Sequence, residues 1–217
     1  FMNNKFYTQY KEKYESVLDK CALLPEEPIA EEYDHAVVLP LRKVKNIKVT
    51  GLGPLEGGVC DDKYNFIAGS QRWYPNPEPL IHKRTCLSAY IPDKKPIYRD
   101  ETVIFGGVIN AHFGHMLVDS MSRMWYRARN PECNYKYIFL LVPSDDNYTK
   151  DFFELSGLSD DKYEIITFPT QFKKIIVPSE TMFALSGHAS KAFLEYFDLL
   201  KENVEKVSTP SKHKKIY

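Results

Sequence analysis

Short apolar segments alternate with segments of helical periodicity from residue 101 onward, and this alternation constrains the fold most. The strand-like segments are TVIFGG, YKYIFLLVP, YEIITF and KKIIVP, and the last helix-like segment is SKAFLEYFDLLKENVEKV. Strands that are apolar on both faces are typical of parallel sheets covered by helices. The pattern therefore predicts an α/β fold with a Rossmann-like, mostly parallel sheet and flanking helices over residues 101–207.

Three further regions are predicted around this layer. Residues 1–34 combine a charged helix over residues 3–20 with an acidic linker that contains two prolines. Residues 35–100 form a strand-rich region with the β-like runs HAVVLPL, VKNIKVTG, NFIAGS and CLSAYIP between turn residues. Residues 208–217 have the composition of a polar linker, and their ending KIY resembles the start of a strand, which predicts a further domain after it.

The charge balance limits the partners of this chain. Lys and Arg together number 29, and Asp and Glu together also number 29, so the formal net charge is zero. Such a chain has no overall field that would attract nucleic acid, and nucleic acid is not an expected partner. The sequence has no run of 18 apolar residues and no secretion signal at its start, so we expect no transmembrane segment. Four widely separated cysteines predict reduced, structural thiols.

The stretch GGVINAHFGHMLVDSMSRMWYR, residues 106–127, carries polar groups along a predicted helix. His115, Asp119 and Arg123 are four residues apart and would share one stripe of that helix, with His112 at its border. The residues expected to face the sheet are Phe113, Met116, Leu117, Met121 and Met124. Imidazole, carboxylate and guanidinium groups together can bind a polar substrate and transfer a proton.

Other interpretations of this stretch are open. Pairs at i and i+4 also stabilise an ordinary solvated helix. His112, His115 and Asp119 offer three metal ligands, although the H-E-x-x-H signature is absent. Gly106 and Gly107 precede the helix as in anion-binding loops, but the sequence has neither G-x-G-x-x-G nor G-K-[ST] there. A tight strand-to-helix turn is therefore the favoured interpretation of the two glycines.

The same stretch resembles the hallmark motif of glycosyltransferase family 61, which includes bacterial capsular polysaccharide biosynthesis proteins. The matching residues are His112, Phe113, Gly114, His115, Asp119, Arg123 and Trp125. The segment GGVCDDKYNFIAGS resembles the short hairpin that precedes this motif in the family. The segment FFELSGLSDDKYEIITFPTQFKKIIVPSE resembles its continuation. The resemblance covers residues 50–180.

The resemblance implies a GT-B enzyme, in which two Rossmann-like domains form the active site in the cleft between them. Such an enzyme transfers a sugar from a nucleotide-sugar to a saccharide hydroxyl, with inversion, in capsular or surface polysaccharide biosynthesis. This chain would be the N-terminal, acceptor-side half, followed by a donor-binding domain. The implied location is cytoplasmic, with peripheral association at the inner face of the membrane as an option.

We expect no cofactor and metal-independent chemistry, because the sequence has no D-x-D motif that would hold a metal on nucleotide phosphates. The adjacent acids in CDDK, SDDN and SDDK are interpreted as turn residues.

The family match assigns a role to each catalytic candidate. His115 or Asp119 is the expected base, with fixing of the imidazole tautomer as the other role for Asp119. Arg123 would orient Asp119 or contact phosphate, and His112 would line the acceptor site. The substrate-binding candidates are Gly107, Asn110, Gly114, Trp73 and His188. Trp73 could stack on a sugar or anchor a loop, and His188 could face the cleft or lie in the loop before a helix.

Two other functions remain open from the sequence. One is a noncatalytic module that binds carbohydrate or protein. The other is a metal-dependent hydrolase that uses His112, His115 and Asp119.

Overall fold

The computed structural model of this 217-residue chain describes residues 27–43, 55–71, 87–110, 113–141, 148–183 and 188–207. The helix predicted over residues 3–20, the strand predicted in VKNIKVTG and the linker predicted over residues 208–217 lie outside the described residues. The strands are β1 (Ala30–Asp34), β2 (Val37–Lys43), β3 (Leu55–Cys60), β4 (Leu87–Ser88), β5 (Ile97–Ile109), β6 (Lys136–Leu141), β7 (Tyr163–Ile165), β8 (Thr170–Pro178), β9 (Met182–Phe183) and β10 (His188–Ala189). The helical elements are η1 (Ala68–Ser70), α2 (Phe113–His115), η3 (Met116–Ser120), α3 (Trp125–Arg129), α4 (Tyr148–Leu155) and α5 (Lys191–Val207).

Eight of the described strands form one sheet, in the order β4-β3-β2-β8-β5-β6-β7, with β1 also paired to β8. The pairs β5 with β6, β5 with β8, β6 with β7 and β3 with β4 are parallel. The pairs β1 with β8, β2 with β8 and β2 with β3 are antiparallel. The chain is therefore a mixed α/β protein, and the strand-rich region shares its sheet with the segment that follows it. The predicted boundary between residues 100 and 101 falls inside β5.

Strand β1 was not predicted, because its residues AEEYD lie in the acidic segment interpreted as a linker. It pairs with β8 from Ala30 opposite Pro178 to Asp34 opposite Lys174, and β2 continues the same register. Between β1 and β2, His35 adopts a φ of 53°, while its backbone N–H still donates to the carbonyl of Lys173. The two strands therefore act as one long antiparallel partner of β8 with a local break at His35.

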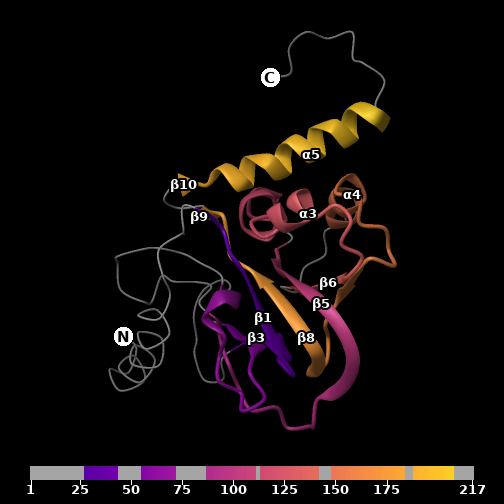
Figure 1. Ribbon diagram of the computed structural model, residues 1–217. Coiled ribbons are helices and arrows are strands. Elements are labelled where there is room, and N and C mark those ends of the chain that lie inside the picture. Colours follow the sequence, from indigo (N-terminus) through magenta and orange to yellow (C-terminus); the bar gives the residue numbers. More distant parts are fainter. Residues whose placement is uncertain are drawn as a thin grey trace.

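The sheet separates two apolar clusters, as the alternation of side chains along each strand requires. One cluster joins β2, β3 and β4 to residues such as Phe105 and Ile138. The other contains Ile104 and Phe139, which point to the opposite face, and packs against the helices. Figure 1 shows α3, α4 and α5 gathered on one side of the sheet. The helices therefore cover one face, while the strand-rich part contributes to the core of the other.

The first half of β5 curves strongly, as Figure 1 shows. This curvature brings Arg99 within 2.9 Å of Glu164 on β7, although β6 separates the two strands in the sheet. Arg99 also pairs with Glu101 and lies over the ring of Phe172. The opposite, carboxyl end of β5 is fully buried and contains the first residues of the motif of residues 106–127.

Several predicted elements are confirmed. Segment 135–143 contains β6, whose central residues are buried as expected for a strand covered on both faces. The helix predicted before Gly157 is α4, and Gly157 ends it with a φ of 72°. The final amphipathic helix is α5. The prediction of a strand in NFIAGS is wrong. Phe66 forms only a single antiparallel β-bridge with Cys60, and the segment continues into η1.

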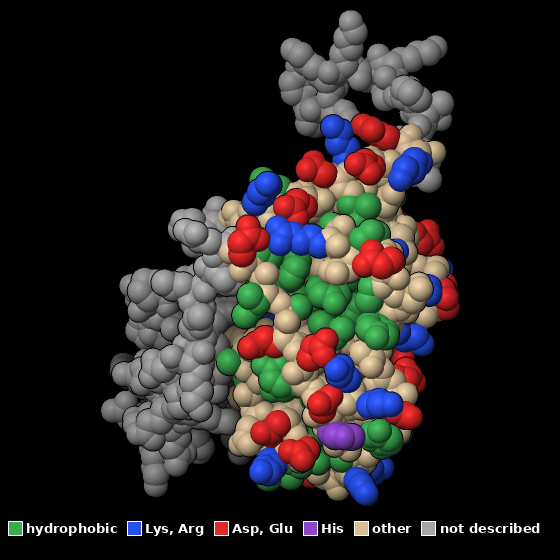
Figure 2. Space-filling model, viewed as in Figure 1, with side chains coloured by type: hydrophobic (Ala, Val, Ile, Leu, Met, Phe, Trp, Pro, Cys, Tyr) green, Lys and Arg blue, Asp and Glu red, His purple; other side chains and the backbone are tan. Residues whose placement is uncertain are grey.

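The turn interpretation of the adjacent acids holds for the described pairs. Asp61 accepts hydrogen bonds from the backbone N–H groups of Lys63 and Asn65, and Asp160 and Asp161 lie in the turn after α4. The SDDN pair lies outside the described residues. On the face drawn in Figure 2, acidic and basic side chains are interspersed, which agrees with the balanced charge.

Two of the four cysteines fall in the described residues, and neither forms a disulfide there. Cys60 is buried and Cys133 is half-buried. Burial raises the pKa of the Cys60 thiol to about 12, with a further contribution from the charge of Asp61. A thiol with so high a pKa is protonated at neutral pH and behaves as a small apolar side chain. Within the part of the chain that the structure describes, no helix is both long and apolar enough to cross a membrane.

Candidate functional site

The motif of residues 106–127 begins at the carboxyl end of β5, next to the carboxyl end of β8. The two strands are parallel neighbours, so Asn110 after β5 and Glu180 after β8 emerge at the same edge of the sheet. Both side chains are buried, with exposed fractions of 8% and 7%. In chain order β6 and β7 extend the sheet on one side of β5, whereas β8 lies on its other side. The candidate site therefore lies where the strand order changes direction.

The predicted strand-to-helix turn at Gly106 and Gly107 is wrong, because both glycines lie inside β5. The register of β5 against β6 shifts between Phe105 and Gly107, which marks a β-bulge. Gly107 has a φ of 104°, a conformation that residues with a side chain rarely adopt. A Cβ atom there would lie 3.3 Å from Cδ of Arg123. The bulge therefore gives the Arg123 side chain room to pack directly against the backbone of β5.

The predicted helix is interrupted. After the single turn α2, residues of η3 form a π-helical turn in which the N–H of Met121 donates to the carbonyl of Met116. A further turn then leads into α3, where the N–H of Arg127 donates to the carbonyl of Met124. Serine competes with helical hydrogen bonding through its side chain, and both Ser120 and Ser122 bind backbone groups outside the helix. Tertiary contacts therefore override the helical pattern of the sequence.

The predicted polar stripe does not join His115 and Arg123, because the helix between them is not regular. A π-helical turn bonds residues five apart, so residues four apart no longer align. His115 is half-buried, whereas Arg123 is only 2% exposed. Of the residues expected to face the sheet, Met116, Met121 and Met124 are fully buried, Leu117 is half-buried, and Phe113 is 55% exposed. The alternative of a solvated helix face is therefore wrong for Arg123.

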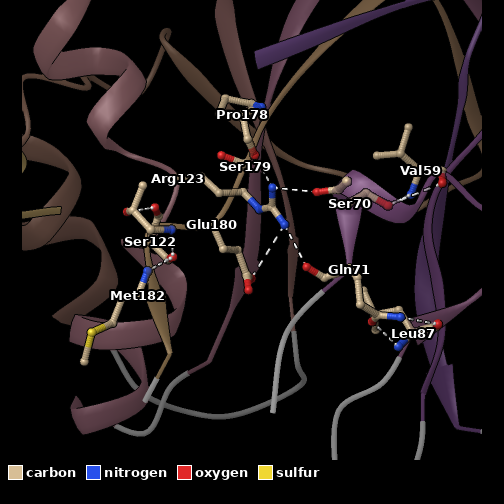
Figure 3. A network of polar contacts seen from close by, with 12 residues as sticks. Val59, Ser70, Gln71, Leu87, Ser122, Arg123, Pro178, Ser179, Glu180 and Met182 are labelled. Atoms are coloured by element: carbon tan, nitrogen blue, oxygen red, sulfur yellow. Dashed lines mark hydrogen bonds and ion pairs between the residues drawn. The ribbon is translucent and has the colours of Figure 1, made fainter. Parts of the chain in front are cut away.

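Arg123 lies at the junction of three segments that are far apart in the sequence (Figure 3). Its Nη1 donates to the carbonyl oxygens of Gly69, at 2.8 Å, and Pro178. Its Nη2 donates to the carbonyl oxygen of Gln71 at 2.7 Å and lies 3.6 Å from Oε1 of Glu180. The guanidinium also lies over the ring of Phe105, 5.4 Å from its centroid. The side chain thus connects the segment after β3, the end of β8 and the motif.

The charge of Arg123 is balanced inside the protein. Burial lowers the pKa of Arg123, and the negative charge of Glu180 acts in the opposite direction. A buried charge is tolerated only when it is paired and hydrogen-bonded, and Arg123 has both kinds of partner. In this geometry the guanidinium is directed at backbone carbonyls and at Glu180, and not at a phosphate group at the surface. We therefore assign Arg123 a structural role in place of the expected contact with phosphate.

Two serines fix the rest of the turn. The N–H of Asn110 donates to Oγ of Ser120 at 3.0 Å, which closes the segment of residues 110–120. Oγ of Ser122 accepts from the N–H groups of Thr181, at 2.8 Å, and Met182, at 3.1 Å. The hydroxyl of Thr181 donates back to the carbonyl of Ser122. The turn is thereby joined both to the end of β5 and to the chain that follows β8.

Gln71 extends this network into the strand-rich part. Its amide nitrogen donates to the carbonyl of Leu87 at 3.0 Å, and its amide oxygen accepts from the N–H of Leu87 at 2.6 Å. Ser70, beside it, accepts from the N–H of Val59 at 3.1 Å and donates to the carbonyl of Ile67. The backbone that Arg123 holds is therefore itself fixed to β3 and β4 (Figure 3).

The structure describes only some of the remaining candidate site residues. Gly114 and His115 lie in α2, at the start of the helical segment. Trp125 of the motif is buried, and its Nε1 donates to the carbonyl of Ser179 at 2.9 Å. The backbone of Asp119 lies in η3 and that of His188 lies in β10. The side chains of these two residues are not among the described ones. His112 and Trp73 lie outside the described residues.

Among the described side chains, no group of three His, Cys, Asp or Glu residues is arranged to hold a metal ion. The hydrolase hypothesis names His112, His115 and Asp119, of which only the His115 side chain is described. It therefore stays a hypothesis.

Sequence reasoning missed the polar partners of the motif. These are Gln71, Ser120, Ser122, Glu180 and Thr181, which are all buried. One signal was present: polar residues directly after the buried strand KKIIVP lie at the edge of a parallel sheet where ligands and functional groups gather. Ser120 and Ser122, on either side of Met121 in the predicted helix, were a second signal, since serines need hydrogen-bond partners when they are buried.

No protein-family model, no curated protein and no solved structure was found to match this chain.

Proposed function

We propose that this chain is the acceptor-side portion of an inverting glycosyltransferase similar to family 61, with a Rossmann-like layer in a GT-B arrangement. The observation that carries the proposal is the position of the motif. It starts at the carboxyl end of β5, where the parallel order β7-β6-β5-β8 changes direction. In open α/β sheets, ligands bind outside the carboxyl ends of the strands at such a switch point.

The proposed reaction joins a saccharide hydroxyl to the anomeric carbon of a nucleotide-sugar. As the acceptor oxygen forms the new bond, the bond from the anomeric carbon to the diphosphate breaks, and the nucleoside diphosphate leaves. The hydroxyl proton passes to a base in the motif, which we assign to His115 or Asp119. His112 would line the acceptor site, and Arg123 would support the site from the interior. No metal is part of the proposal.

The environment of His115 suits this role. It is half-buried and lies in α2, on the segment that Asn110 and Ser120 close. A base that is partly shielded from water, yet open to a substrate on one side, can accept a proton from a bound hydroxyl.

The experiment that tests the proposal uses the protein encoded by the complete gene. It is incubated with a panel of nucleotide-sugars and saccharide acceptors, and release of nucleoside diphosphate is measured together with the glycosylated product. We expect turnover with one donor class. No turnover with any donor, together with retained saccharide binding, would favour the noncatalytic binding module.

Replacing Asp119 by asparagine is expected to reduce transfer about 10²- to 10⁴-fold, because the amide can neither accept the proton nor stabilise an imidazolium. The rate of product formation under saturating donor is the measurement. The matched control is Asp160→Asn, which removes an exposed carboxylate from the turn after α4. Transfer by Asp119→Asn at the rate of the control would exclude both the base and the orienting role.

A further inference from the structure

The histidine of the candidate site lies on a segment that is held at both ends. The hydrogen bond from Asn110 to Ser120 brings the two ends of residues 110–120 together. Three residues after Ser120, Arg123 extends back beneath the end of β5, where it lies over the ring of Phe105 and fills the space that a side chain at Gly107 would need. The segment that carries His115 is therefore closed by Ser120 and supported by Arg123.

Arg123 also fixes this segment relative to the rest of the sheet. Its hydrogen bonds reach Pro178 at the end of β8, and Gly69 and Gln71 after β3. Glu180 supplies the opposing charge at 3.6 Å. A planar guanidinium with several donors can hold acceptors from different segments at once, which a lysine ammonium cannot reproduce in the same geometry.

We propose that Arg123, with Glu180 as its counter-charge, is a positioning residue that sets the location of His115 relative to the carboxyl ends of β5 and β8. The catalytic consequence rests on the proposed function, whereas the positioning itself does not. The guanidinium acts through the backbone of the described residues 113–123 and does not touch the substrate. Changes at Arg123 or Glu180 therefore alter the surroundings of the His115 imidazole even in protein that stays folded.

The test is a nuclear magnetic resonance measurement of the imidazole signals in the folded protein. The chain contains six histidines, and the His115 signal is assigned by its loss in His115→Asn. The variants are Arg123→Lys, which keeps the charge, and Glu180→Gln, which keeps the shape. The matched control is Arg99→Lys, because Arg99 also pairs with carboxylates and lies over a phenylalanine ring, at the other end of β5.

We expect Arg123→Lys and Glu180→Gln to shift the His115 signal and to leave that of His35, in the turn between β1 and β2, in place. Arg99→Lys should leave the His115 signal unchanged. If Arg123→Lys does not fold, Glu180→Gln decides the test alone. An unchanged His115 signal in the folded variants, or an equal shift of both histidines, would overturn the proposal.

This readout separates the positioning role from the proposed function, since it needs no turnover. If transfer is found, Arg123→Lys should lower kcat while KM for the donor stays near that of the wild type, because the base is displaced and donor binding is not. A shifted His115 signal without any turnover would keep the positioning role and reject the transferase.

Discussion

Arg123→Met is expected to lower the free energy of unfolding by about 3–5 kcal/mol, because it breaks the buried ion pair with Glu180 by removing one of the two charges. The carbonyl oxygens of Gly69, Gln71 and Pro178 would also lose their donor. A buried acceptor that loses its partner adds to the cost. Urea unfolding monitored by circular dichroism measures the difference.

Two controls separate this effect from a general loss of packing. The double variant Arg123→Met with Glu180→Leu removes both charges and should regain part of the stability, since an apolar replacement of a buried ion pair is often neutral. Arg99→Met removes a partly exposed arginine, whose ion pairs stabilise by no more than about 1 kcal/mol. Equal losses for Arg123→Met and Arg99→Met would contradict the buried network.

Gly106→Ala is expected to destabilise the protein by about 1–3 kcal/mol, because the added methyl group meets the ring of Phe139. The Cβ atom would lie 2.7 Å from Cδ1 of that ring and nearer still to two other ring atoms. Phe139 is fully buried and stacks on Phe153 at 4.6 Å between ring centroids, so it has little room to move. The midpoint of thermal unfolding should fall accordingly.

A double-mutant cycle tests the cause. Phe139→Leu creates space at the ring position, so the combined variant Gly106→Ala with Phe139→Leu should lose less stability than the sum of the two single variants. Strict additivity would mean that the contact with Phe139 does not explain the need for glycine at position 106.

The local sequence pattern was sufficient to predict a strand or helix where each of its faces has a uniform environment, either buried or exposed. The apolar run of β6 is buried on both faces, and the periodicity of α5 places Tyr196 and Leu200 in the core. In such elements the residue types and the tertiary structure favour the same conformation. Strand β1 could not be found in this way, since AEEYD has no strand pattern and pairs only because β8 offers an edge.

The structure of the motif was harder to predict because it too depends on contacts with segments that are distant in the sequence. Its residues His115, Asp119 and Arg123 have the spacing of a regular helix, which suggested one polar stripe. Helical spacing does not reveal that Ser120 and Ser122 accept hydrogen bonds from backbone groups of other segments. The backbone carbonyls that accept from Arg123 are 52 to 55 residues away in the sequence, so no local pattern could identify them.

Burial is what distinguishes the roles within the motif. The resemblance to family 61 grouped Arg123 with the catalytic candidates, but only a structure reveals that its guanidinium is inside the protein. His115, by contrast, is half-buried and lies in α2, which follows β5 in the chain. The difference between a fully buried arginine and a half-buried histidine underlies both proposals for this site.

The most direct measurement is the rate of nucleoside diphosphate release by His115→Asn, beside the matched variant His35→Asn, in the protein encoded by the complete gene. Asparagine tolerates the positive φ of His35, so the control should fold and turn over like the wild type. We predict that His115→Asn loses about 10²- to 10⁴-fold in rate while its free energy of unfolding stays near that of the wild type. Equal turnover by the two variants would contradict a transferase site at His115.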